Sequence, residues 1–141
     1  ALDVTIQAQI MDLMKRLQDE EGKSIVLITH NMGLVAEMAN DVAVMYMGQV
    51  IESGTVEQIF ENPCHPYTRA LMQSVPVLGM EPGKRLASIS GQTPAPDELD
   101  EGCAFAPRCP YASEQCRKPV EDCEAEAGHT VKCVLKGRLA E

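Results

Sequence analysis

Apolar side chains recur every three or four residues near the start of the chain and predict an amphipathic helix. Within residues 4–18 they stand at Ile6, Ile10, Leu13, Met14 and Leu17. This spacing places them on one helical face. Asp3 is a suitable N-cap because its carboxylate can accept from the first free N–H groups. Gly22 predicts the end of the helix.

A short continuous apolar run then replaces the helical pattern. Residues 24–29, read Ser-Ile-Val-Leu-Ile-Thr, have the length and composition of a strand buried on both faces of a parallel sheet. His30 follows the run, and Asn31 can cap a second helix over residues 32–40. A strand followed by a helix in this order predicts a β/α unit.

The next segment predicts a β-hairpin. Residues 41–47 form an apolar run, Gly48 and Gln49 are a tight-turn signal, and residues 50–54 return as the partner strand.

Two short helices are expected after the hairpin. Thr55 and Gln58 have the spacing of a capping box, which opens a helix to Phe60. A further helix is expected over residues 66–74, and Pro76 would stop it. Regular periodicity is then lost, so the sequence predicts a domain boundary near residues 76–82.

Composition and charge narrow the class of protein. The chain has 141 residues, of which 45% are hydrophobic and 23% charged, with a net charge of -9. This composition is typical of a globular chain. An acidic surface repels phosphate backbones, so a nucleic-acid partner is not expected. No apolar run approaches the ~18 residues of a membrane span.

Five of the 6 cysteines gather near the end of the chain, at Cys103, Cys109, Cys116, Cys123 and Cys133. Clustered thiols without an export signal favour metal binding, while disulfides and free thiols remain the alternatives. No Cys-x-x-Cys pair occurs, which disfavours both a zinc ribbon and an independent thiol-redox protein. Cys64 and His65 are interpreted as loop residues rather than ligands.

Several segments, in order, resemble the ATP-binding subunits of ABC transporters. Residues 1–4 and 24–31 resemble the D-loop and the H-loop, and residues 45–54 resemble the hairpin that follows. The string Asn-Pro-Cys-His-Pro-Tyr-Thr at 62–68 and the cysteine-containing segment 102–111 are similar to the dipeptide and oligopeptide importer branch.

The resemblance implies roles for two residues. His30 resembles the switch histidine that senses the γ-phosphate of ATP, and Asp3 resembles the D-loop aspartate between two nucleotide-binding domains. In the family the Walker A loop, the LSGGQ signature and the Walker B Asp lie upstream, and this sequence contains none of them. We therefore expect a C-terminal piece that starts at the D-loop and neither binds ATP tightly nor hydrolyses it alone. ATP and Mg²⁺ would belong to the full-length parent.

The fold expected from pattern and resemblance is α/β: a partial P-loop NTPase (ABC ATPase) core with a loop-rich, cysteine-containing C-terminal extension. Residues 1–76 would be the distal half of the nucleotide-binding domain, and residues 77–141 the extension. Parallel strands left without their neighbours would favour self-association of the piece.

In some members of this family, four tail cysteines hold a [4Fe–4S] cluster. The matching residues here are Cys103, Cys109, Cys116 and Cys133, while Cys123 departs from the pattern and is an alternative ligand. The implied partners are a second ATPase subunit, identical or related, and the transporter's membrane subunits, with the protein peripheral on the cytoplasmic face of the plasma (inner) membrane. The rival hypothesis is a non-catalytic metal or iron–sulfur regulatory module on an α/β scaffold.

Overall fold

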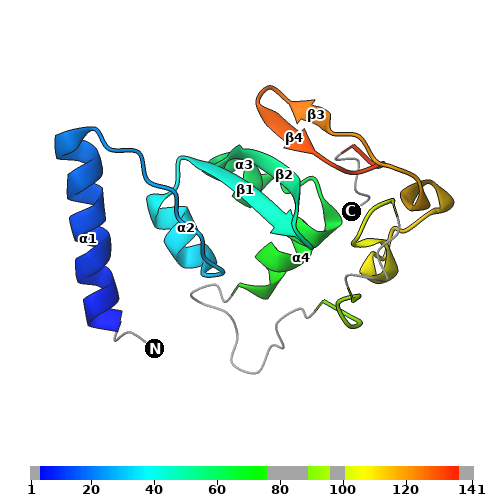
Figure 1. Cartoon of the computed structure of the whole chain (residues 1–141), viewed down its shortest axis with the longest axis horizontal. Coiled ribbons are helices and arrows are strands. Elements are labelled where there is room, and N and C mark those ends of the chain that lie inside the picture. The colour runs from blue at the N-terminus through cyan, green and yellow to red at the C-terminus, as the bar shows by residue number, and fades with distance from the viewer. Residues whose placement is uncertain (1–3, 76–88, 96–100, 137–141) are drawn as a thin grey trace. The chain divides into compact units, whose positions relative to one another are not determined.

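The computed structural model describes residues 4–75, 89–95 and 101–136 (Figure 1). The chain divides into two compact units, residues 1–39 and residues 40–141. Asp3, Pro76 and the expected domain boundary lie outside the described residues. No helix in the described ranges combines the length and the apolar character needed to cross a membrane.

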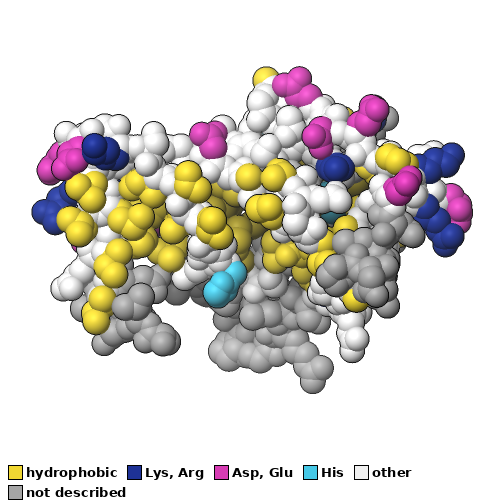
Figure 2. All heavy atoms as spheres, in the orientation of Figure 1, with side chains coloured by type: hydrophobic (Ala, Val, Ile, Leu, Met, Phe, Trp, Pro, Cys, Tyr) yellow, Lys and Arg dark blue, Asp and Glu magenta, His cyan; other side chains and the backbone are white. Residues whose placement is uncertain are grey.

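The first unit contains the two helices that the sequence predicts. Helix α1 (Val4–Glu21) is followed by Gly22, whose φ of 62° is the left-handed conformation that favours glycine. Helix α2 (Met32–Met38) begins at Asn31, whose Oδ1 accepts from the Gly33 N–H at 3.1 Å. The apolar face of α1 is at the surface, where Figure 2 shows it as a yellow stripe, with Ile6, Ile10, Leu13 and Leu17 between 39% and 48% exposed.

The structure corrects the prediction of a buried strand at residues 24–29. The segment is not a strand, and Val26 and Ile28 are 89% and 94% exposed. A strand exists only where a neighbouring backbone supplies hydrogen bonds, and no segment within the described ranges pairs with this one. The prediction of a parallel strand is therefore wrong for this structure.

The second unit is organised by a four-stranded antiparallel sheet with the order β1-β2-β4-β3. Strands β1 (Asp41–Tyr46) and β2 (Gln49–Thr55) form the predicted hairpin. Its turn is at Met47 and Gly48, which have φ values of 47° and 76°. The sequence did not predict β3 (Cys123–Glu126) or β4 (His129–Val131). The β2–β4 pairing joins segments from the two sides of the expected boundary.

Two helices follow the hairpin, as the sequence predicts. Helix α3 (Val56–Glu61) opens with the capping box, in which Thr55 N–H donates to Gln58 Oε1 at 3.0 Å and Gln58 N–H donates to Thr55 Oγ1 at 3.3 Å. Helix α4 (Pro66–Ser74) has the predicted bounds, and Pro66 stands at its first position, where the missing N–H costs nothing.

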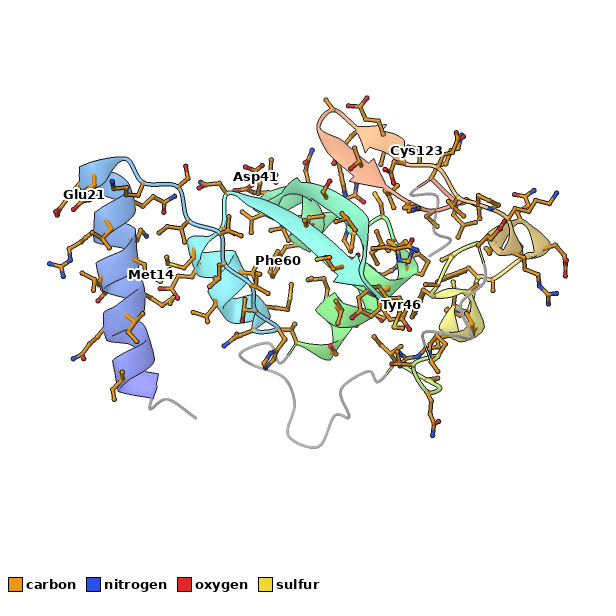
Figure 3. All side chains as sticks on the ribbon, in the orientation of Figure 1. Met14, Glu21, Asp41, Tyr46, Phe60 and Cys123 are labelled. Carbon is orange, nitrogen blue, oxygen red and sulfur yellow. The ribbon has the colours of Figure 1, made fainter. Side chains whose placement is uncertain are left out.

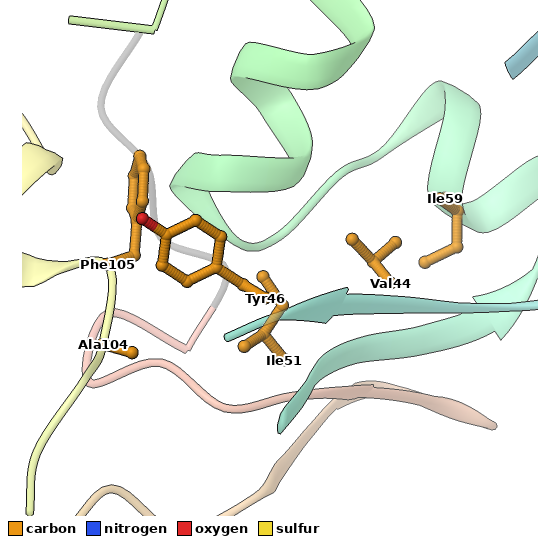
Figure 4. Packing of buried hydrophobic residues seen from close by; sticks show 6 residues of the cluster. All are labelled: Val44, Tyr46, Ile51, Ile59, Ala104 and Phe105. Carbon is orange, nitrogen blue, oxygen red and sulfur yellow. The ribbon is translucent and has the colours of Figure 1, made fainter. Parts of the chain in front are cut away.

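An aromatic cluster connects the hairpin and α4 to the cysteine-rich segment. Phe105 is 2% exposed, and its ring lies 5.4 Å from that of Tyr46 and 5.3 Å from that of Tyr67. Figure 4 shows Phe105 beside Tyr46 at the end of the core that continues to Val44 and Ile59. Burying a phenylalanine contributes about 1.5–3 kcal/mol, so this contact is a main attachment of the segment.

The guanidinium of Arg108 holds a second piece of chain in place. It donates to the backbone carbonyls of Ile89 and Ser90 at 3.1 and 3.0 Å, and to Thr93 Oγ1 at 3.2 Å. It also donates to the Tyr46 hydroxyl at 3.4 Å. One planar fork of donors therefore fixes residues 89–93 against the core.

Gly102 lies where two backbone segments approach too closely for a side chain. A Cβ there would collide with the backbone of Cys116 and Arg117. The close approach permits the hydrogen bond from Cys103 N–H to the Cys116 carbonyl, at 2.8 Å.

Replacing Gly102 with Ala should destabilise the second unit, because neither backbone segment can yield as a flexible side chain would. We expect a loss of about 1–3 kcal/mol in the free energy of unfolding, measured by urea denaturation. Glu101→Ala, at the exposed neighbouring position, is the control and should leave stability unchanged. Equal stability of the two variants would contradict the prediction.

Candidate metal centre

Four of the tail cysteines border one small, partly enclosed cavity. Its lining includes Cys103, Cys109, Cys116 and Cys133, together with His65. These are the four cysteines selected from the sequence. The structure therefore brings the expected thiols together, and their role as ligands stays a prediction.

Short, irregular segments position the four thiols. Cys109 follows the 3₁₀ helix Ala106–Arg108, and Cys116 is inside a second one, Glu114–Arg117. Cys133 comes two residues after β4, whose pairing with β2 anchors it to the sheet. Loops of this kind depend on anchors at their ends, because they bury little apolar surface of their own.

Burial makes these thiols hard to ionise. It raises the pKa of Cys103 and Cys109 above the ordinary value, and it raises the pKa of Cys133 to about 11. Repulsion from Cys116 adds to the increase at all three, and Cys103 and Cys109 add to it at Cys133. Four thiolates would repel one another here unless a cation were present, and a bound metal supplies that charge.

Backbone N–H groups point at the same sulfurs. The N–H groups of Phe105, Tyr111 and Leu135, each two residues after a cysteine, form hydrogen bonds that oppose the rise in pKa at Cys103, Cys109 and Cys133. The Ser113 N–H donates to Cys116 Sγ at 3.5 Å. Donors arranged in this way stabilise a thiolate rather than a thiol, which fits ligation of a metal.

Cys123 lies on β3 (Figure 3). It is not among the residues that line the cavity. Its thiol donates to the Val131 carbonyl at 3.3 Å and lies 3.9 Å from the Cys133 carbonyl. These contacts belong to a small apolar cluster with Cys64 and Val131. Cys133, by contrast, lines the cavity together with Cys103, Cys109 and Cys116.

A second group of metal-binding residue types lies under the sheet. Within the described ranges, Glu52, Cys64 and His129 are the only three such side chains whose ligand atoms all lie within 4.8 Å of one another. All three side chains are buried, at 2% exposure or less. Neither Glu52 nor His129 is predicted as a ligand from the sequence, and Cys64 is interpreted there as a loop residue.

Hydrogen bonds within the protein already satisfy the Glu52 carboxylate. Oε1 accepts from the Cys64 N–H at 2.6 Å and lies 2.8 Å from His129 Nε2, while Oε2 accepts from the His65 N–H at 2.9 Å. An ion could bind only by displacing these bonds. We therefore interpret this group, the Glu52 junction, as a structural connection among β2, the 64–65 backbone and β4.

The remaining contacts of the junction support that interpretation. His129 Nδ1 lies 3.3 Å from Glu126 Oε1, so the imidazole bridges two carboxylates. Burial, with Glu52 and Glu126 nearby, raises the pKa of Cys64 to about 11. The Cys64 thiol donates to the Asn62 carbonyl at 3.4 Å, which is the behaviour of a neutral thiol.

The nucleotide-sensing prediction is not tested by this structure. The His30 side chain is exposed and follows the unpaired segment 24–29, so it does not stand at the edge of a parallel sheet. The N–H of Asn31 donates to Thr29 Oγ1 at 3.0 Å, which fixes the backbone next to His30. Asp3 lies outside the described residues, so its role also stays a prediction.

Comparison with known proteins identifies relatives. Residues 51–116 match the family described as oligopeptide/dipeptide transporter, C-terminal region. The chain is 47% identical, over 99% of its length, to a Brucella ovis protein named for peptide import and ATP binding. It is 49% identical to the oligopeptide transport ATP-binding protein AppD of Bacillus subtilis and 48% identical to the dipeptide transport ATP-binding protein DppD of Haemophilus influenzae, over 96% and 94% of its length. It spans only 43%, 41% and 40% of these relatives.

Replacing Glu52 with Gln should destabilise the second unit strongly. The amide offers one oxygen where the carboxylate offers two, so at least one of the two buried N–H groups loses its acceptor. We expect a loss of about 3 kcal/mol in the free energy of unfolding, measured by urea denaturation. Glu57→Gln, on the exposed face of α3, is the matched control and should change stability little. A loss below that of the control would contradict the structural role of the junction.

Proposed function

We propose that the parent of this chain is the ATP-binding subunit of a peptide-importing ABC transporter, because residues 51–116 match the C-terminal region of the oligopeptide/dipeptide transporter family. The observation that carries the proposal is the identity of 47–49% over 94–99% of the chain with relatives named for peptide transport and ATP binding. The order of the motifs agrees with that identity. In the parent, ATP hydrolysis with Mg²⁺ would drive uptake of peptides.

Within that activity, His30 is proposed to contact the γ-phosphate. A neutral imidazole can donate one hydrogen bond to a phosphate oxygen while its other nitrogen accepts one. The exposure of the side chain and the anchored backbone at Asn31 support this proposal, because they leave the ring accessible at a defined position. Asp3 is proposed to lie at the interface with a second ATPase subunit.

The parent is proposed to work at the inner face of the plasma membrane as a peripheral protein. It would reach the membrane through the transporter's membrane subunits. The residues before 77 would form the distal part of a P-loop NTPase core and serve the nucleotide. Residues 77–141 would form an extension that carries the cysteines.

We further infer that Cys103, Cys109, Cys116 and Cys133 hold a [4Fe–4S] cluster. Their shared cavity, the backbone donors to their sulfurs and the separate contacts of Cys123 support the inference. Spacing supports a cluster over a single zinc ion, because no three of these sulfurs lie within 4.8 Å of one another. Thiolates on one zinc at ~2.3 Å would be about 3.8 Å apart. A cluster binds each thiolate through a different iron, so its ligands are spaced more widely.

Replacing His30 with Ala in the full-length parent should abolish ATP turnover, because the transition-state charge on the γ-phosphate would lose a donor. We expect a fall of at least about 10²-fold in kcat, measured on the assembled transporter with saturating ATP. Lys23→Ala, an exposed cation in the same unit, should retain wild-type turnover. Retention of more than half the activity by the His30 variant would overturn its assignment.

Replacing Cys133 with Ser should prevent cluster assembly, whereas Cys123→Ser should permit it. We expect iron and acid-labile sulfide to fall at least ~10-fold in the Cys133 variant after anaerobic reconstitution, with loss of the visible absorption. The Cys123 variant should match the wild-type chain. Equal loading of both variants would contradict the ligand set, and absence of iron from the wild type would contradict the cluster itself.

A further inference from the structure

His65 forms part of the wall of the cysteine cavity. Its side chain is 1% exposed and its Nε2 lies 4.0 Å from Cys103 Sγ. This position was not predicted, because His65 stands between Cys64 and Pro66 in a segment interpreted as a loop. It precedes α4, and that helix start determines how the ring is oriented.

One ring nitrogen of His65 is already used as a helix cap. Nδ1 accepts from the Tyr67 N–H at 3.0 Å and therefore carries no proton of its own. Because that nitrogen is an acceptor, the ring is a neutral imidazole rather than an imidazolium. A neutral imidazole carries one proton, which must then be on Nε2.

The Nε2–H donor points at a ligand sulfur. The hydrogen-bond partner of His65 Nε2 is Cys103 Sγ, and the 4.0 Å between the two atoms is within the range for hydrogen bonds to sulfur. In the part of the chain that the structure describes, Thr68 Oγ1 is the only buried side-chain nitrogen or oxygen without a partner. The contact therefore satisfies a donor that would otherwise be buried without an acceptor.

The ring has little freedom to turn away from Cys103. The His65 N–H donates to Glu52 Oε2 at 2.9 Å, so the Glu52 junction fixes the backbone of His65. The ring of Phe105 lies 5.9 Å away and limits its rotation. A donor held in this way needs no reorganisation when the charge on the sulfur changes.

We propose that His65 is a positioning residue that donates a hydrogen bond to the Cys103 thiolate and raises the reduction potential of the bound cluster. The inference rests on the proposed [4Fe–4S] centre. Reduction adds negative charge that the sulfurs share, and a donor to one sulfur stabilises the more negative state. If His65 served only as the cap of α4, it would use only Nδ1, and replacing it would leave the reduction potential unchanged.

Two substitutions separate the donor from the cap. His65→Asn keeps an oxygen close to the position of Nδ1, where it can still cap α4, but its short side chain does not reach Cys103. His65→Gln places an amide N–H near the position of Nε2 and gives up the cap. The Asn variant therefore removes the donor to Cys103 and keeps the cap, whereas the Gln variant keeps the donor and removes the cap.

The test is the midpoint potential of the reconstituted cluster in this chain, followed by electron paramagnetic resonance during a redox titration. His65→Asn should shift the midpoint potential to more negative values by ~59 mV. For one electron, this shift is a tenfold change in the ratio of oxidised to reduced cluster at a given potential. His65→Gln should keep the wild-type potential and unfold at a lower urea concentration. The iron–sulfur stretching bands in resonance Raman spectra should shift only in the Asn variant.

The outcomes separate the two proposals. If the wild-type chain binds no cluster, both the proposed [4Fe–4S] centre and the proposed role of His65 are contradicted. A wild-type cluster whose potential is unchanged in His65→Asn overturns the inference alone. If the Asn variant does not load, His65→Leu, which lacks both the donor and the cap, takes its place: a potential shifted to more negative values supports the donor role, and a wild-type potential contradicts it.

Discussion

A carboxylate buried beneath the sheet determines how the cysteine-rich segment is attached to the rest of the second unit. Glu52 projects from β2 and is 1% exposed, which would be costly without compensation. Two backbone N–H groups and an imidazole provide that compensation. Each donor comes from a part of the chain that must be fixed for the cysteines to meet: the 64–65 backbone before α4, and β4 before Cys133.

The local elements could be predicted from sequence because short-range signals specify them. The Asn31 cap, the Thr55 capping box and Pro66 at a helix start each depend on residues close in the chain. Strand β4 has three residues and no apolar alternation, so nothing in its own sequence marks it. It is a strand because β2 supplies a hydrogen-bonding edge, which is a tertiary effect.

The same distinction holds for the site. The four thiols could be selected from sequence only through the family resemblance, since their spacing fits no tight metal motif. Glu52 and His129 could not be selected, because their partnership joins positions 77 residues apart. The expected strand at 24–29 failed for the opposite reason: its apolar composition was read correctly, but the described chain offers it no neighbour.

The pairing of β2 with β4 also affects the order of events during synthesis. The hairpin of β1 and β2 can form as soon as both strands leave the ribosome. The other edge of β2 stays unpaired until β4, which ends at residue 131, has been synthesised. Loop closure over so long a stretch is slow, and an unpaired edge is exposed to other chains in the meantime. The edge of β2 is thus covered only by the last strand of the sheet to be translated.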